Sequence, residues 1–185
     1  EKIDDRIDYY ISTDSIEDFY KLLLSSYEHE FGTDFIKNKL ATIAISRNGL
    51  TETELLAINK VSTINWSQFY CSFLRHFNLT NGLISFSHQY LRNAVNEKYL
   101  SKSDIQHYRT LVYDWFKKNP CDRSLLEIPY QLYESGKNDK LYDFLSDYNT
   151  FSFLFSFDYD FLRIYWNYLM HLSNSLKPLR IGQPS

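Results

Sequence analysis

The sequence predicts a mainly α-helical protein in which a winged-helix domain, three helices plus a β-hairpin, is followed by an α-helical domain. Three observations predict this fold. Apolar residues recur at helical spacing along most of the chain, and one Asn-Gly pair with alternating apolar flanks interrupts that pattern. Only five Gly and four Pro occur among 185 residues, which disfavours a fold of many short strands.

The first predicted helix covers about residues 16–31. Asp14 or Ser15 is suited to cap its start, and Gly32 is suited to end it. Residues 1–32 are therefore predicted to hold a linker and one helix. The apolar residues of this helix recur every three or four positions and so share one face: Ile16, Phe19, Tyr20, Leu23, Tyr27 and Phe31.

Residues 33–102 are predicted to form the winged-helix domain. A first helix is expected at about 34–46 and ends near Gly49. Thr51 and Glu54 fit a capping box that begins a short second helix. A third helix is expected at about 65–77, because its apolar residues follow the helical template closely: Trp66, Phe69, Tyr70, Phe73, Leu74 and Phe77.

A β-hairpin is predicted next, at Asn81-Gly82. This pair lies between two short runs with alternating apolar residues, 77–80 and 83–86. It is a strong hairpin signal because both central residues of the turn need positive φ. Three helices followed by a hairpin is the order of a winged helix, and a fourth helix is expected from about His88 to Tyr99.

Residues 103–172 are predicted to form the helical domain. Its first helix carries apolar residues from Ile105 to Phe116 and closes before Pro120. A second helix is expected at 122–135, with Pro129 as a kink or break. Two more are marked by the apolar positions of 141–148 and 161–172. The tail, 173–185, has little periodicity and is expected to be flexible.

Composition excludes several classes of function. The formal net charge is −3 and the pI is about 6.0, so we expect no nucleic-acid partner and no anionic-membrane partner. Two cysteines, no signal peptide and no apolar run of membrane-spanning length favour a cytoplasmic location. The five His residues are scattered without Cys at ligand spacing, so no metal site is expected.

The chain is not expected to be an enzyme. Its five glycines are isolated, and the Gly-x-x-x-x-Gly-Lys-Ser/Thr string that cradles phosphates in P-loop NTPases is missing. Asp158 and Asp160 lie near aromatic residues, but a helix-start role suits them better than acid–base chemistry.

His88 is the residue that we single out as a candidate site. It falls between the hairpin and the start of the next helix, where backbone N–H groups favour an anion. A histidine there adds a donor to a phosphate that another domain brings. The structural alternative is that His88 caps the helix or packs under the wing.

The order of several motifs resembles the region behind the nucleotide-binding core of NACHT-type STAND NTPases, especially nephrocystin-like and telomerase-associated-protein-like ones. Residues 27–32 (YEHEFG) are similar to the helix that precedes their winged helix. Residues 46–56 (SRNGLTETELL) resemble their S-R-x-G-L-S/T-E-x-E-L-L stretch. Residues 83–92 (LISFSHQYLR) resemble their hairpin-F-x-H-x-x-L-R element. The later segments EIPYQL and KLYDFL resemble their following helices, so that the match spans about residues 16–170.

This resemblance implies a non-catalytic regulatory segment of a signal-transduction NTPase. Residues 1–32 would close an upstream nucleotide-binding core in cis, and the rest would couple that core to downstream repeats or effectors. His88 matches the histidine that contacts the phosphates of bound ADP. No cofactor is implied for this chain itself, whereas ADP or ATP is implied for the full-length protein. Gln89 departs from the Glu-bearing version of animal immune receptors.

Two other functions stay open. The first is a free-standing helical scaffold that binds protein partners through its aromatic surface, since 18% of the residues are aromatic. The second is a winged-helix DNA-binding protein. Its third helix would enter the major groove, but that helix offers only Arg75 and His76, and the hairpin has no Lys or Arg. Specific DNA binders contact about six to ten phosphates.

Overall fold

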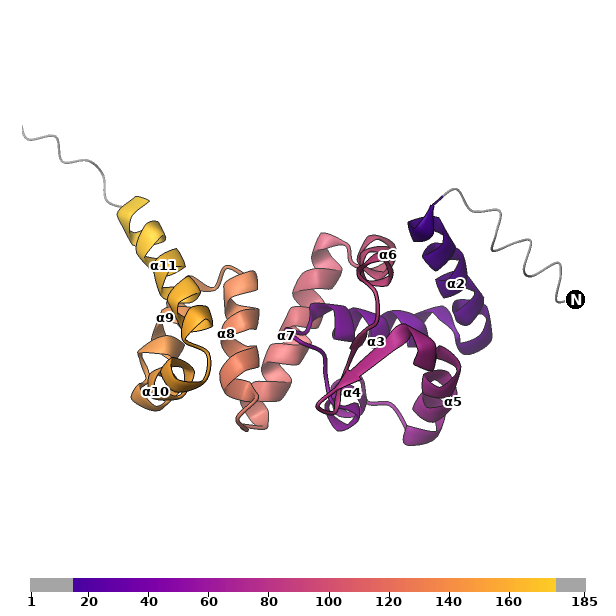
Figure 1. Cartoon of the computed structure of the whole chain (residues 1–185), viewed down its shortest axis with the longest axis horizontal. Helices are drawn as coiled ribbons and strands as arrows, with labels where there is room; N and C mark the ends of the chain where they lie inside the picture. Colours follow the sequence, from indigo (N-terminus) through magenta and orange to yellow (C-terminus); the bar gives the residue numbers. More distant parts are fainter. Residues whose placement is uncertain (1–14, 176–185) are drawn as a thin grey trace, which may run out of the picture. The chain divides into compact units, whose positions relative to one another are not determined.

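The computed structural model describes residues 15–175. Within this range the chain is mainly helical, with one two-stranded antiparallel sheet. The chain forms two compact units, the first ending at Trp115 and the second beginning at Phe116. The junction lies inside the long helix α7 (Lys102–Lys118), which Figure 1 shows as one continuous rod.

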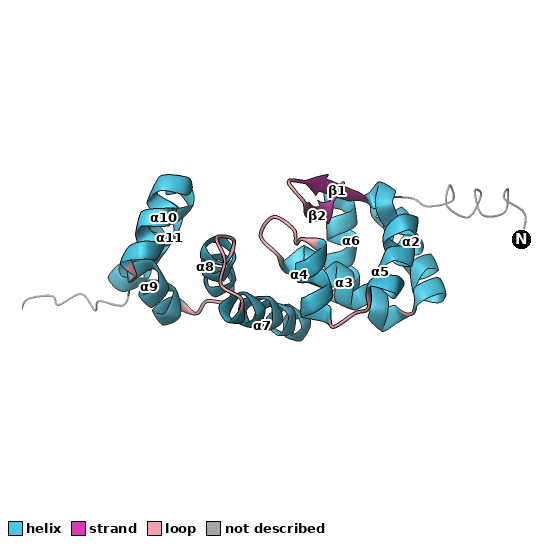
Figure 2. Ribbon diagram, turned by 90° about the horizontal axis from the view of Figure 1, so that it is seen from below, coloured by secondary structure: helices cyan, strands magenta, loops and turns pink. Residues whose placement is uncertain are grey.

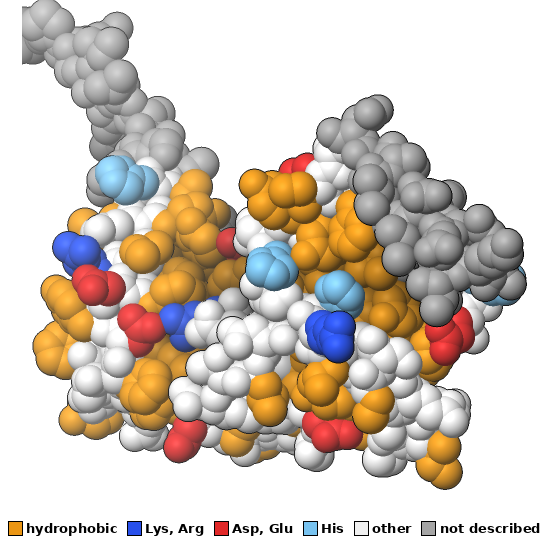
Figure 3. Space-filling model, turned by 45° about the vertical axis from the view of Figure 1, so that its right-hand side comes forward, with side chains coloured by type: hydrophobic (Ala, Val, Ile, Leu, Met, Phe, Trp, Pro, Cys, Tyr) orange, Lys and Arg blue, Asp and Glu red, His pale blue; other side chains and the backbone are white. Residues whose placement is uncertain are grey.

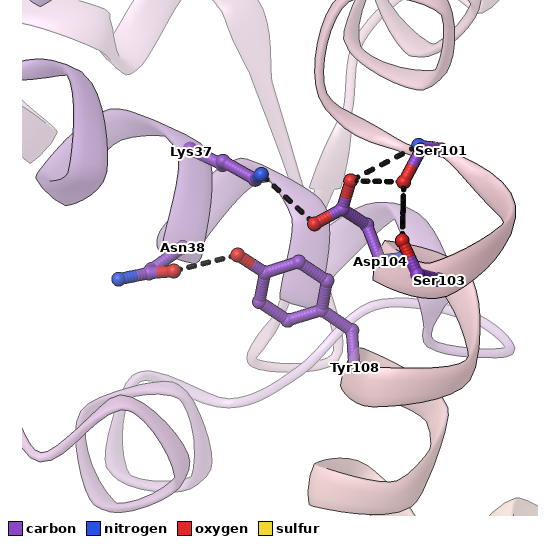
Figure 4. Close-up of polar contacts among 6 residues, drawn as sticks. All are labelled: Lys37, Asn38, Ser101, Ser103, Asp104 and Tyr108. Carbon is purple, nitrogen blue, oxygen red and sulfur yellow. Dashed lines mark hydrogen bonds and ion pairs between the residues drawn. The ribbon is translucent and has the colours of Figure 1, made fainter.

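The compact unit ends later than the predicted domain boundary between residues 102 and 103. Polar contacts explain the difference, because they tie the first half of α7 to α3 (Thr33–Ile45). Lys37 and Asp104 form an ion pair of 2.8 Å, and Tyr108 donates a hydrogen bond of 2.6 Å to Asn38 (Figure 4). The first unit therefore keeps the first half of this helix.

The first described helix, α2 (Ile16–Phe31), has the predicted bounds and caps. The Ser15 Oγ accepts a hydrogen bond of 3.0 Å from the Asp18 N–H. Gly32 follows the helix with a φ of 90°, a value that glycine adopts without strain. This helix packs against α3 and α6 (Gln89–Tyr99), and its buried side chains are Tyr20 and Leu24.

Helix α3 is the centre of the first unit. It contacts α2, α4 (Glu52–Asn59), α6 and β2 (Leu83–Phe86). Most of its side chains are therefore buried, including every side chain from Lys39 to Ile45. The buried apolar set is Ile36, Leu40, Ala41, Ile43, Ala44 and Ile45.

The predicted third helix is present as α5 (Thr63–Phe73), but it ends earlier than residue 77. The next turn, η1 (Leu74–His76), is a 3₁₀ helix that leads into the hairpin. Ser62 caps α5, and the rings of Trp66, Phe69 and Phe73 are buried in the core.

The predicted hairpin is confirmed. Strand β1 (Phe77–Thr80) pairs antiparallel with β2, and Phe77 lies opposite Phe86. Asn81 and Gly82 have φ values of 52° and 78°, as the turn requires. Figure 2 shows the hairpin beside α6 and α3, and Leu50 adds a single antiparallel bridge to Ile84.

The second unit contains the end of α7 and four further helices: α8 (Ser124–Glu134), α9 (Asn138–Ser146), α10 (Tyr148–Phe157) and α11 (Tyr159–Ser175). Of the two effects predicted for Pro129, a kink or a break, the break is wrong, because α8 is continuous through this residue. Proline removes one backbone donor, and the buried neighbours Ile128 and Leu132 hold the remaining turns against the core.

Helix α10 was not expected from the sequence. Helix α11 also continues to Ser175, past the predicted end at 172 and into the predicted tail. The rest of that tail, 176–185, and residues 1–14 of the predicted linker lie outside the described residues. Across the described part of the chain, no helix combines the length and the apolar character needed to cross a membrane.

Candidate functional site

His88 occupies the N-cap position of α6, directly after β2. Its backbone is extended, with φ −136° and ψ 141°, and its carbonyl accepts the first helical hydrogen bond from the Arg92 N–H at 3.3 Å. Its side chain is exposed and makes no capping bond. The two structural roles considered for this histidine, capping the helix and packing under the hairpin, are therefore not seen.

The first turn of α6 is consequently uncapped by a side chain. The first N–H groups of an α-helix, here those of Gln89, Tyr90 and Leu91, have no acceptor within the helix. The positive end of the helix dipole adds to their attraction for anions. A carboxylate or hydroxyl at position 88 would normally satisfy one of these groups, so His88 leaves this end open to an external acceptor.

The turn 46–50 lies beside this helix end and is held rigidly. The buried Ser46 Oγ donates to the Ile43 carbonyl at 2.7 Å and accepts from the Gly49 N–H at 3.0 Å. Leu50 then exchanges two backbone hydrogen bonds with Ile84, at 3.1 and 2.8 Å. The turn is thus fixed to both α3 and β2.

Gly49 is required in this turn for two reasons. Its φ is 97°, which L-amino acids rarely adopt. A Cβ at this position would also lie 2.3 Å from the Ile84 carbonyl oxygen. Gly49 thus allows the turn to pass close to β2. In this position of the turn, Arg47 and Asn48 line the same groove as the start of α6.

These elements enclose an open groove of about 450 Å³. Its lining includes two arginines and one histidine but no carboxylate, so its field favours anions. The walls come from the turn 46–50, both strands of the hairpin and the first turn of α6. The lining residues are Arg47, Asn48, Asn78, Thr80, Ser85, Phe86, His88, Gln89 and Arg92.

Arg92 is positioned by its surroundings. Its Nη1 donates a hydrogen bond of 3.0 Å to the Ala44 carbonyl near the end of α3. Its guanidinium lies 5.7 Å from the centre of the Phe86 ring. Because a guanidinium carries five N–H donors in a fixed fork, the bond to Ala44 uses one donor and orients the others.

His76 lies directly before β1. Its carbonyl accepts a hydrogen bond of 3.0 Å from the N–H of Ser87, which directly follows β2. Burial lowers the pKa of His76, and the nearby charges of His88 and Arg75 lower it further. A lowered pKa keeps His76 neutral near neutral pH. The arginines that line the groove are Arg47 and Arg92.

The sequence identified His88 but missed Arg47 and Arg92. Both arginines stand in the two motif stretches, 46–56 and 83–92, that also carry the resemblance. Nothing in their spacing shows that these stretches meet, because the contact depends on the bridge between Leu50 and Ile84. Asp158 has the expected helix-start role, since its Oδ1 accepts from the Phe161 N–H at 3.2 Å.

Within residues 15–175, no three His, Cys, Asp or Glu side chains are grouped closely enough to hold a metal ion. Comparison with protein-family models, with curated proteins and with solved structures gave no match for this chain.

Proposed function

We propose that this chain is a non-catalytic regulatory segment of a NACHT-type signal-transduction NTPase. In this proposal it couples a nucleotide-binding core, located upstream in the same polypeptide, to downstream repeats or effectors. The core supplies bound ADP, and the groove beside His88 receives the phosphates of that ADP in the closed state.

The order of elements in the first unit supports the interpretation of this unit as a winged helix. The order is α3, the single bridging residue Leu50, α4, α5 and then the hairpin of β1 and β2. A bridge from the segment between the first two helices to the second hairpin strand is what a three-stranded wing needs. The capping box of Thr51 and Glu54 at the start of α4 is also present.

The observation that carries the proposal is the set of cationic side chains around an uncapped helix end. Exposed His88 stands at the start of α6, and Arg47 and Arg92 line the same groove. Phosphate oxygens are bound well by such a combination of helix N–H groups and arginine forks. Contacts made only in the closed state bias a two-state equilibrium toward it, and loss of those contacts releases it.

The test is ADP release from the full-length protein. Replacing His88 with Ala removes a phosphate contact, and we expect ADP to dissociate about tenfold faster, within the usual range of coupling energies. Stopped-flow release of a fluorescent ADP analogue measures this rate. His107→Ala is the control, because His107 is an exposed histidine on α7 away from the groove. Equal release rates for the wild-type protein and His88→Ala would refute the proposal.

A second substitution separates function from folding. The substitution is His88→Asp. Aspartate is a strong helix cap, so this variant should have a free energy of unfolding about 1 kcal/mol higher than the wild-type protein. It also places a negative charge among the phosphates, so ADP should dissociate faster still than from His88→Ala. A variant that is more stable yet releases ADP faster cannot be explained by damaged folding.

A helical interaction scaffold is the second candidate, and one observation favours it. The second unit exposes several large aromatic side chains, among them Tyr148 and Phe157. The DNA-binding alternative gains no comparable support, because α5, η1 and the hairpin together contain a single arginine, Arg75.

A further inference from the structure

Helix α10 carries five aromatic residues in ten positions, and its polar residues are Asn149, Thr150, Ser152 and Ser156. Thr150 and Leu154 are buried on its inner side. On its outer side Tyr148 is 79% exposed, Phe155 is 55% exposed, and Phe157 at its end is 66% exposed. Large apolar side chains that are exposed together on one element mark contact surfaces, so the outer side of α10 has the character of a contact surface.

The outer rings of α10 form an ordered row. Phe151 stacks on Phe155 with ring centres 6.0 Å apart, and Phe155 meets Tyr159 edge-on at 5.4 Å. A second pair, Phe153 and Phe157, stacks at 5.3 Å. Because these rings already contact one another, a partner that covers them loses little side-chain entropy on binding.

A shallow groove of about 490 Å³ runs along the same helix, lined by Tyr148, Asn149, Ser152, Phe153, Ser156 and Phe157. Ser152 and Ser156 lie one helical turn apart, between the aromatic side chains. Small residues between larger ones form a groove into which a ridge of another helix fits. Figure 3 shows that hydrophobic side chains also reach the surface in groups over the described part of the molecule.

The exposed aromatic area is large enough for a specific contact. The five rings of Tyr148, Phe151, Phe155, Phe157 and Tyr159 are each between 39% and 79% exposed. With about 150–250 Å² per ring, they offer on the order of 500 Å² of aromatic surface. Patches of about 300–600 Å² are the largest on typical monomers and often have a function.

The segment of the chain that carries this surface is acidic. Residues 141–162 contain four aspartates, at positions 143, 147, 158 and 160, and no Lys, Arg or His. Asp160 is paired with Arg163 at 3.2 Å. Asp147 caps the start of α10, where hydrogen bonds from Thr150 lower its pKa and keep it ionised. Asp158 stands at the other end of the helix.

We propose that the outer face of α10, with its aspartate rim, binds an amphipathic helix of a partner protein whose apolar stripe is flanked by Lys or Arg. Apolar anchors of such a helix would cover the aromatic row, and its cations would face Asp143, Asp147 and Asp158. This mode of recognition places one helix in the groove of another. The inference is independent of the nucleotide switch.

A second copy of this chain fits the surface less well. Two α10 helices that cross in antiparallel fashion bring Asp147 of one copy toward Asp158 of the other. Like charges opposed across an interface disfavour association. The acidic rim therefore selects a basic partner rather than itself.

The test uses the whole chain and two synthetic peptides of about 18 residues, long enough to form helices. One is an amphipathic helix of Leu and Lys, and the other has Glu in place of Lys. Fluorescence anisotropy should show binding of the Leu/Lys peptide only. Phe155→Ser should weaken binding at least about tenfold, and Ile64→Ser on α5, which removes another exposed apolar side chain, should leave binding unchanged.

Asp147→Asn tests the rim separately, because Asn keeps the helix cap while it removes the charge. It should weaken binding severalfold and reduce its dependence on salt. Equal binding of the two peptides, or equal binding by the wild-type chain and Phe155→Ser, would overturn the proposal. A chain that dimerises in sedimentation experiments, with loss of the dimer in Phe155→Ser, would also overturn it, because the face would then be occupied by a second copy.

Discussion

At the scale of single residues, several residues of the stretch 46–56 stabilise local structure. Ser46 and Gly49 fix the turn after α3, and Thr51 and Glu54 form the capping box of α4. Four of the residues that carry the family resemblance in this stretch are therefore explained by hydrogen bonds and backbone geometry. Arg47 is the charged residue of the turn that faces the groove.

The turn gives a prediction for Gly49→Ala. A methyl group there meets the Ile84 carbonyl at 2.3 Å while the backbone keeps a positive φ. We expect the free energy of unfolding to fall by about 2–4 kcal/mol, because backbone strain and overpacking both destabilise the folded state. Urea denaturation measures this change.

Gly82→Ala is the matched control for that experiment. Gly82 also has a positive φ, 78°, but no atom lies within 4 Å of its hypothetical Cβ. This variant should lose only about 1 kcal/mol, the cost of the left-handed conformation. Equal losses at the two positions would contradict the close contact between the turn and β2.

At the scale of elements, α3 and α7 are joined by a polar cluster rather than by apolar packing alone. One Asp104 oxygen pairs with Lys37 at 2.8 Å, and the other accepts from the Ser101 N–H at 3.2 Å (Figure 4). Bonds from Lys37 and Ser101 lower the pKa of Asp104 to about 2. Burial raises the pKa of the neighbouring Tyr108 to about 12.

The lowered pKa of Asp104 predicts a pH dependence. Because the carboxylate is favoured in the folded state, its contribution to stability is complete above about pH 4 and is lost as the pH falls toward about 2. Asp104→Asn should remove this contribution. Thermal unfolding from about pH 6 to about pH 2 should therefore show wild-type and variant midpoints that converge in acid. Parallel curves over the whole range would contradict this role.

Elements with strong local signals were predictable from the sequence. Helix α2, the capping box of α4 and the hairpin at Asn81-Gly82 depend on apolar period, caps and turn chemistry, which act within a few residues. Helix α10 was missed because Phe stands at every second position from 151 to 157, a spacing that hides the helical period. Its signal was Asp147, which accepts a hydrogen bond of 2.9 Å from the Thr150 N–H.

The candidate groove was less predictable than the elements around it. His88 could be found because the start of a helix can be predicted from the sequence alone. Arg47 and Arg92 could not, because they meet His88 only through the pairing of Leu50 with Ile84 and the bond from Arg92 to Ala44. Such long-range contacts leave no period in a single sequence.

At the scale of the whole molecule, the two compact units carry surfaces of different chemistry. The first unit carries the cationic groove, which suits the phosphates of a nucleotide. The second unit carries the aromatic face of α10 with its aspartate rim, which suits a basic helix.

The central claim is that this chain works behind a nucleotide-binding core in the same polypeptide. The most direct measurement is the mass of the native protein, by immunoblot of its source cells with an antibody against this chain. The chain itself has a mass of 22.2 kDa. We predict a band far above that value, because the native protein would also contain the upstream core. A band at the mass of the chain alone would contradict the account and leave the helical scaffold in its place.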